Sequence, residues 1–489
     1  MTAVDDILLT ALKEHEHRES DAHITIQEHI HRIKTQLGDA SAISPYSKSS
    51  APLSVVSFKC LLQDTGYPME VYLPGDMEMS SDVDWSKLKE RWVGWGVEVP
   101  GEQQWTKPQA DITAGLQGIS IGSQDLPASV HAKTPLPQQQ GGSYLGALLK
   151  VYDDIAYKPA SVHEFIGLLS TSPIPSNEPE DADIVPTIHV LSKRDLAPET
   201  TDVDPSDDQV REELVDYLST AFNPPDRVAA EFLLLLLISS PTARPMSLPV
   251  LGTLAVNFRH SGESFTSAFN SVVSSVVPHY VPLPLTLSLL HSHPFQPAMT
   301  DANGLNAGLL QLADGTVLAV EEDAMGNGGQ LNEKALKNLK ALVDCVEEQK
   351  VNYEYPYMDG LKMDCSVKVA VLSQGKSLIP VDVDIPICAD GSPSTRPPSL
   401  DAFRSYLARY SSPAHSARLV IPDESSTIIQ DHFVQERKVN RKEAEEVLKR
   451  RMKIARIVAL SYPKAALDGQ VWDKTVKLDE QVAKRHTMS

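Results

Sequence analysis

A change of pattern near residue 200 constrains the fold of this 489-residue chain more than any other feature. Before it, short β-prone runs such as Ser54–Leu62 and Trp92–Val99 are separated by turn residues. After an acidic, proline-containing linker at Pro198–Asp208, helical apolar spacing alternates with short buried strands. The two patterns predict an α+β and α/β multidomain protein of two or three domains.

The first pattern predicts a small β-barrel of the OB type over residues 46–200, because closely spaced short strands with turns between them are typical of that fold. Its other expected strands are Met69–Leu73, Ala147–Tyr152, Glu164–Leu169 and Ile184–Leu191. Residues 103–142 are rich in Gln, Pro, Gly and Ser and are expected to form a mobile insertion. Residues 1–45 are predicted to be a polar helical segment. Its five histidines fit a solvated helix face better than a metal site.

The second pattern predicts an α/β domain over residues 205–398 and a helical region over 399–489. The expected helices are Asp208–Phe222, Arg227–Ser239, Phe265–Val277 and Glu443–Tyr462. The expected strands are Leu248–Phe258, Val281–Leu290, Val317–Val320 and Ser366–Leu372. The most apolar run, Phe232–Ile238, is far shorter than the roughly 20 residues of a membrane span, so it is expected to lie in a core.

Acidic residues follow one of the expected strands, since Val317–Val320 runs directly into Glu321, Glu322 and Asp323. Carboxylates at the end of a buried strand hold magnesium in the Walker B element of nucleotide hydrolases. The same hydrolases need a glycine-rich turn that ends in Lys and then Ser or Thr, because its N–H groups and its lysine bind the phosphates. The sequence therefore raises the question of ATP or GTP hydrolysis.

The slot for that phosphate-binding turn lies between the strand that ends at Phe258 and the helix that begins at Phe265. It holds Arg259, Gly262 and Glu263, with one glycine and no lysine. Glu263 places negative charge where the triphosphate would bind. Hydrolysis is therefore not expected, and Glu321 and Glu322 are expected to form an exposed acidic turn. Motifs of serine hydrolases, zinc proteases and kinases are also absent from the sequence, which predicts no catalytic residues and no cofactor.

The formal charge of −21 opposes direct nucleic-acid binding, because that affinity comes largely from Lys and Arg. An acidic surface suits basic protein partners instead. Four widely spaced cysteines without a CxxC pair suggest reduced thiols, and the N-terminus carries acidic residues where a signal peptide has basic ones. The chain is expected to be soluble, without a membrane segment, and cytosolic or nuclear.

Several stretches together resemble the minichromosome maintenance (MCM) complex-binding protein family. In the N-terminal half they are SFKCLLQDTGYPMEVY (57–72), WGVEVPGEQQW (95–105), LLKVYDD and EFIGLLSTSP (148–173) and VPTIHVL (185–191). In the C-terminal half they are AAEFLLLLLISS (229–240), GLLQLADGTVLAVEED, EEQKVNYEY (347–355) and SQGKSLIPVD (373–382). The likeness extends over most of residues 50–465.

The resemblance implies a distant relative of the MCM helicase subunits, with an OB-like domain, a degenerate AAA+-like domain and a C-terminal helical lid. It implies a noncatalytic nuclear protein that binds MCM subunits and supports their assembly, storage or unloading in DNA replication, the cell cycle and sister-chromatid cohesion. Association with chromatin would then be indirect. The alternatives are an OB-fold protein that binds single-stranded DNA and an active AAA+ ATPase. The partner-binding residues are not predicted.

Overall fold

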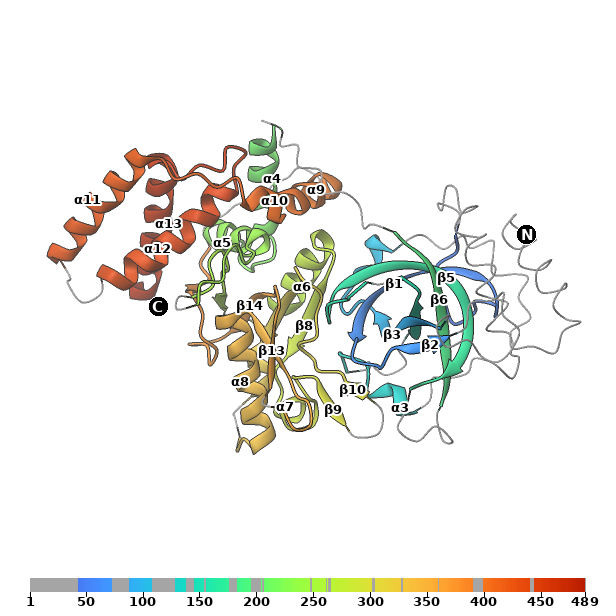
Figure 1. The fold of residues 1–489 in the computed structure, drawn as a ribbon. Helices are drawn as coiled ribbons and strands as arrows, with labels where there is room; N and C mark the ends of the chain where they lie inside the picture. The colour runs from blue at the N-terminus through green and yellow to red at the C-terminus, as the bar shows by residue number, and fades with distance from the viewer. Residues whose placement is uncertain are drawn as a thin grey trace, which may run out of the picture.

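The chain has a mixed α and β structure in the computed structural model (Figure 1). The structure describes residues 43–72, 88–107, 128–137, 145–153, 155–175, 183–194, 204, 206–246, 249–260, 262, 265–300, 304–326, 329–358, 360–389, 399–439 and 444–488. Its two main sheets have six and five strands, and two short hairpins accompany them. Each of the two patterns in the sequence contributes one main sheet.

The six-stranded sheet closes into a ring. Its strands are β1 (Val55–Asp64), β2 (Glu70–Tyr72), β3 (Lys89–Glu98), β4 (Gly146–Val151), β5 (Val162–Pro173) and β6 (Ile184–Arg194). Cys60 of β1 pairs with Glu98 of β3 on one edge and with His163 of β5 on the other. The order β1-β5-β6-β4-β3 therefore returns to β1, with β2 attached outside at β3 and one parallel pair, β4 with β6.

Alternation of side chains along β1 gives the ring a packed interior. Phe58, Cys60 and Leu62 point into a cluster with residues of β3, β4, β5 and β6, whereas Leu61 packs on the outer face. The glycine in Trp92-Val93-Gly94 fits the same interior, because a Cβ on Gly94 would lie 2.0 Å from the Trp92 ring. Successive strand residues face opposite sides. Both sets of side chains on β1 are buried, so both surfaces of this strand are covered.

The five-stranded sheet is parallel throughout. Its strands are β7 (Val256–Arg259), β8 (Tyr280–Pro284), β11 (Val317–Glu321), β14 (Lys368–Ser373) and β15 (Val383–Pro386), in the order β15-β7-β14-β11-β8. Val317 and Ala319 face one apolar cluster, and Leu318 and Val320 face another. Parallel sheets need cover on both faces, and helices supply it here.

The two faces are covered by different helices. The first face carries α4 (Asp207–Ser219), α5 (Arg227–Ile238) and α6 (Phe265–Val276), and the second carries α7 (Leu287–Ser292) and α8 (Glu333–Glu348). The hairpins β9 (Ala298–Thr300) with β10 (Gly304–Asn306) and β12 (Lys350–Tyr353) with β13 (Leu361–Asp364) lie beside the second face. The 3-10 helix η6 (Glu322–Met325) follows β11.

The C-terminal helices join the first of these two cores. They are α9 (Leu400–Tyr410), α10 (Pro413–Ser416), α11 (Asp423–Val439), α12 (Ala444–Leu460) and α13 (Gly469–Met488). Phe403, Ile457 and Trp472 share one apolar cluster with α5 and the sheet. The helices predicted after residue 399 therefore continue the packing of the α/β layer rather than forming a separate core (Figure 1).

Segments from the predicted insertion hold the ring against the parallel sheet. Gln103 donates its backbone N–H to Pro278 O (2.9 Å), beside β8. The short helix α3 (Ala128–His131) leads to Lys133, whose buried Nζ lies 3.0 Å from Asp64 Oδ2 and 3.1 Å from Leu305 O. These contacts, with the outer face of β1 and β3, form a seam between ring and sheet.

Three sequence predictions need correction. Residues 103–107 and 128–137 are fixed parts of the seam rather than a mobile insertion; residues 108–127 and 138–142 lie outside the described residues. The strand expected over Val281–Leu290 ends at Pro284, because Thr286 caps the helix α7 through a bond from Leu289 N. The strand expected over Leu248–Phe258 begins only at Val256. Nearly all of the predicted segment 1–45 lies outside the described residues.

Candidate functional site

The carboxyl ends of β7, β11, β14 and β15 meet at one edge of the parallel sheet, which is where ligands of α/β proteins usually bind. Both halves of the suspected nucleotide site lie at this edge. The slot follows β7, and the acidic residues follow β11. The fold thus brings these two segments to the same edge, and the question becomes what their side chains contact.

Arg259, the cation of the slot, is paired with a carboxylate of a neighbouring strand. Its guanidinium forms an ion pair with Asp384 of β15, and its backbone O accepts from Ile387 N (2.9 Å). Gly262 is exposed, and Glu263 lies outside the described residues. Because Arg259 is held sideways along the sheet edge by Asp384, its charge is already balanced by a carboxylate of the protein.

His260 occupies the space between the slot and the acidic residues. Its ring stacks on Phe265 at the start of α6, with centroids 4.3 Å apart and an interplanar angle of 16°. Its Nε2 lies 2.9 Å from Asp323 Oδ2, without the alignment of a hydrogen bond. A buried aromatic pair therefore lies where a phosphate-binding turn would need its backbone N–H groups open to a ligand.

The acidic residues are engaged as well. Glu321 accepts from Asn270 Nδ2 (3.1 Å), and Asp323 accepts from Gln374 N (2.9 Å). Glu322 accepts from Ser377 Oγ (2.8 Å) and from the backbone N–H of Leu378 (3.1 Å). Carboxylates that accept backbone N–H bonds in this way fasten η6 and the end of β11 to the loop after β14.

Glu322 is buried rather than part of an exposed turn, which corrects the expectation from sequence. Burial raises the pKa of Glu322, while the bonds from Ser377 and Leu378 act in the opposite direction. A carboxylate that is nine-tenths enclosed must find its hydrogen-bond donors within the protein, and the 374–379 loop supplies them. Glu322 is therefore placed to hold this loop.

A second polar group at the same edge was not found from sequence. Buried Asn257 donates to Asp384 Oδ1 (3.0 Å) and to Gly375 O (3.2 Å), and it accepts from Ser373 Oγ (2.9 Å). These bonds join β7, β14 and β15 where a ligand would enter. The available signal was a polar residue within each apolar strand, in LAVNF and VDVDIP.

The described ranges contain neither a candidate membrane span nor a candidate metal site. No helix among them combines the length and apolarity that crossing a bilayer requires. Within the same ranges, three or more His, Cys, Asp or Glu side chains do not gather where they could hold a metal ion. At the candidate nucleotide site, the charged side chains Arg259 and Glu322 are bonded to other groups of the protein.

Comparison with known proteins decides the family. The sequence model of the mini-chromosome maintenance replisome factor family matches residues 116–486. The chain belongs to this family. The match covers strands β4–β6 of the ring, the whole five-stranded sheet and the C-terminal helices, so the resemblance noted in the sequence is confirmed.

Relatives in the family are similar to this chain over most of their own length. The mini-chromosome maintenance complex-binding protein of Arabidopsis thaliana is 28% identical over 429 residues, which are 78% of this chain and 72% of the relative. The protein of the same name from Salmo salar is 27% identical over 88% of this chain and 76% of the relative. That of Homo sapiens is 28% identical, over 78% of this chain and 67% of its own.

Proposed function

We propose that this member of the family is a noncatalytic protein that binds MCM helicase subunits. The observation that carries the proposal is the engaged sheet edge, where Arg259 pairs with Asp384 and Glu322 bonds the 374–379 loop. The names of the relatives, which describe complex-binding proteins, support the choice of partner. In this proposal the degenerate site stabilises a subunit-like shape and catalyses nothing.

We assign the ring as OB-like and the parallel sheet with its helices as AAA+-like. Five strands that close with one parallel pair support the first assignment. A slot after β7 and acidic residues after β11, both at the carboxyl edge of a parallel sheet, support the second. A chain with both units can lie beside a helicase subunit as another subunit would. The C-terminal helices serve as the lid of the second unit.

We further propose that the protein acts in the nucleus, where it supports assembly, storage or unloading of the helicase and contributes to sister-chromatid cohesion. This extension rests on the family resemblance. Specific stable protein–protein interfaces bury roughly 1,200–2,000 Å². Ring and sheet together offer such a surface.

The test is capture of purified MCM subunits from the same organism by the full chain, without nucleotide and after nuclease treatment. We expect stable capture at physiological salt. ATP turnover measured on the same preparation with magnesium should equal that of Glu322→Gln. Failure to capture any MCM subunit by a folded chain would refute the binding proposal, and turnover that disappears in Glu322→Gln would refute the noncatalytic one.

A further inference from the structure

Two of the four cysteines meet although 20 positions separate them in sequence. Cys345 lies in α8, and Cys365 lies in the connection between β13 and β14. Their Sγ atoms are 3.9 Å apart, and both side chains are buried. The other two cysteines lie apart from this pair, since Cys60 is inside the ring and Cys388 is exposed. They can therefore serve as comparison thiols when the reactivity of the pair is measured.

The backbone around the two thiols is held on both sides. The Gln349 side chain donates to Cys345 O (3.0 Å) and to Val367 O (3.0 Å), and Cys365 N donates to Gln349 O (2.9 Å). Arg244 adds a bond to Cys365 O at 2.6 Å. Gln349 itself adopts a φ of 50°, a left-handed conformation that costs a non-glycine residue energy and persists where the surroundings over-determine it.

Cys365 is also within reach of a small solute. It borders a small hollow, with room for about one water-sized molecule, between the hairpin β12–β13 and the ring turn at residues 158–160. Tyr353, Met363 and Lys158 line the same hollow. Cys365 is 8% exposed and Cys345 is fully enclosed behind it. The two thiols therefore differ in access, as an attacked and a resolving cysteine do.

We propose that Cys345 and Cys365 are a modification site, a dithiol that a small peroxide converts reversibly into a disulfide. A disulfide has an S–S length of ~2.04 Å, so the sulfurs must approach by about 1.9 Å. That approach requires rotation about the two Cα–Cβ bonds. The disulfide would join the end of α8 to the start of β14 and close a segment that contains the hairpin β12–β13.

The chemistry balances in two steps. The Cys365 thiolate attacks one oxygen of hydrogen peroxide, the O–O bond breaks, and a sulfenic acid forms. The other oxygen leaves as hydroxide and becomes water with the proton that the Cys365 thiol released on ionising. The Cys345 sulfur then attacks Cys365 Sγ, the S–O bond breaks, and the hydroxide leaves as water with the proton of the Cys345 thiol. Two thiols and one peroxide yield one disulfide and two waters, and a thiol reductant reverses the change.

The surroundings make this oxidation slow. The neighbouring Cys345 thiol, burial and the Asp314 carboxylate raise the pKa of the Cys365 thiol, so little thiolate is present near neutral pH. The pair would stay reduced through brief exposure and respond to sustained peroxide. Once formed, the disulfide fixes the base of the hairpin, whose exposed tip carries Tyr357 and Met358.

The test uses the reduced full chain, sustained hydrogen peroxide, alkylation under denaturing conditions and tryptic mass mapping. Trypsin places Cys345 in peptide 341–350 and Cys365 in peptide 363–368. We expect these two peptides to be joined, with the loss of two alkylatable thiols that a thiol reductant restores. Cys388→Ser, the matched control, should give the same joined pair, and Cys345→Ser should not.

Hydrogen exchange of residues 350–364 gives a second measurement on the same samples. We expect it to slow on oxidation in the wild type and in Cys388→Ser, and to stay unchanged in Cys365→Ser. The proposal is wrong if Cys388 is oxidised while both buried thiols still alkylate. It is also wrong if Cys365 is oxidised equally in wild type and Cys345→Ser, since that is the chemistry of a single thiol.

Discussion

Several buried charges in this protein are paired with a charge of opposite sign, and the pair Arg211 and Glu231 is the clearest case. Arg211 is fully buried and binds Glu231 through two bonds, of 2.6 and 3.3 Å. Lys474 of α13 contributes a third bond, 3.0 Å from Glu231 Oε1. Although burial alone would raise the pKa of Glu231, Arg211 and Lys474 lower it to about 2. The pair joins α4, α5 and α13 across one core.

Glu231→Gln should lower the free energy of unfolding at pH 7 by up to ~3–5 kcal/mol, because Arg211 loses its buried partner and keeps only the half-exposed carboxylate of Glu212. The folded pKa of Glu231 is below the ordinary 4.5, so its stabilisation is present above pH 4.5 and is lost as pH falls toward 2. The difference between wild type and variant should therefore shrink over that range. Urea unfolding at several pH values measures it.

The matched control is Glu347→Gln on the exposed surface of α8, where removal of the charge should change stability by less than ~0.5 kcal/mol. A pH-independent difference between wild type and Glu231→Gln would contradict the assignment of Glu231 as an ionised partner. Equal effects at Glu231 and Glu347 would contradict its burial.

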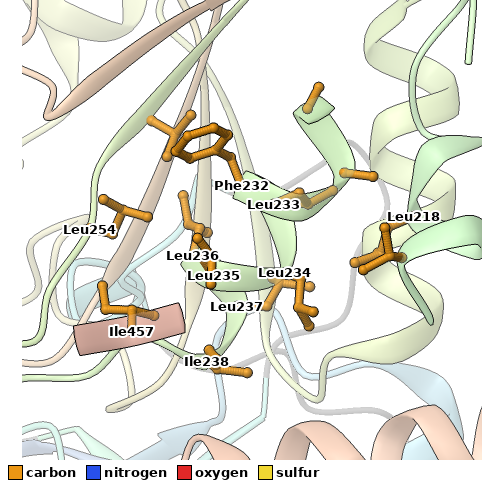
Figure 2. Close-up of a cluster of buried hydrophobic side chains, with 14 of the residues drawn as sticks. Leu218, Phe232, Leu233, Leu234, Leu235, Leu236, Leu237, Ile238, Leu254 and Ile457 are labelled. Carbon is orange, nitrogen blue, oxygen red and sulfur yellow. The ribbon is translucent and has the colours of Figure 1, made fainter. Parts of the chain in front are cut away.

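The helix α5 shows what an apolar element does in this fold. Every residue from Val228 to Ile238 is buried, and Figure 2 shows side chains of Leu218, Leu254 and Ile457 around it. A helix that is apolar on all sides needs packing on all sides, which confirms that the run Phe232–Ile238 lies in a core. Asp226 fixes its start by accepting from Ala229 N at 2.9 Å and by pairing with Arg485 of α13.

Leu235→Asp should destabilise the protein by several kcal/mol and reduce its yield as soluble protein, because an unpaired carboxylate would enter the core between α5 and the sheet. Leu336→Asp on α8 is the matched control, since Leu336 is 57% exposed. Thermal unfolding of both variants is the measurement. Equal melting temperatures for wild type and Leu235→Asp would show that α5 is not packed in this way.

At the scale of the whole molecule, the contacts of the seam fix the ring against the parallel sheet. Asp64 accepts from Leu305 N (2.9 Å) and from Lys133 Nζ (3.0 Å), so ring, insertion and sheet share one buried group. At the far end of the seam, Trp105 donates to Ser274 O (3.1 Å) and stacks under Arg404 of α9, 4.0 Å from its ring. Three regions of the sequence are thereby joined into one body (Figure 1).

Lys133→Met should loosen this seam by ~3–5 kcal/mol, because Asp64 would stay buried without its cation. We expect faster hydrogen exchange at residues 304–306 and 128–137 and earlier proteolysis between ring and sheet. Lys158→Met tests an exposed ion pair of the same seam, 3.9 Å from Asp314, and should change stability by less than ~1 kcal/mol. Unchanged exchange in Lys133→Met would mean that the ring is held by other contacts.

Direct binding to bare DNA should be weak at physiological salt, since the chain carries a formal charge of −21. Fluorescence anisotropy with single-stranded and double-stranded DNA is the measurement. Submicromolar affinity with a steep salt dependence would favour the alternative of an OB-fold DNA-binding protein over the proposed MCM-binding role.

Local pattern was sufficient to predict all six strands of the first main sheet and the helices α4, α5, α6 and α12. Alternation and helical spacing record which face of an element is buried, and those periods are set by backbone geometry alone. The missing lysine between Arg259 and Phe265 was equally readable, because a phosphate-binding turn needs particular residues in sequence order.

Contacts between distant positions were decided only by the tertiary structure. Composition made residues 103–142 look like a mobile insertion, yet Lys133, which follows α3, meets Asp64 of β1 in the folded chain. Glu322 looked exposed because its donors, Ser377 and Leu378, lie some 55 residues further along the chain. A sequence records which groups need a partner, but burial and pairing depend on which strands become neighbours, and that is a property of the whole fold.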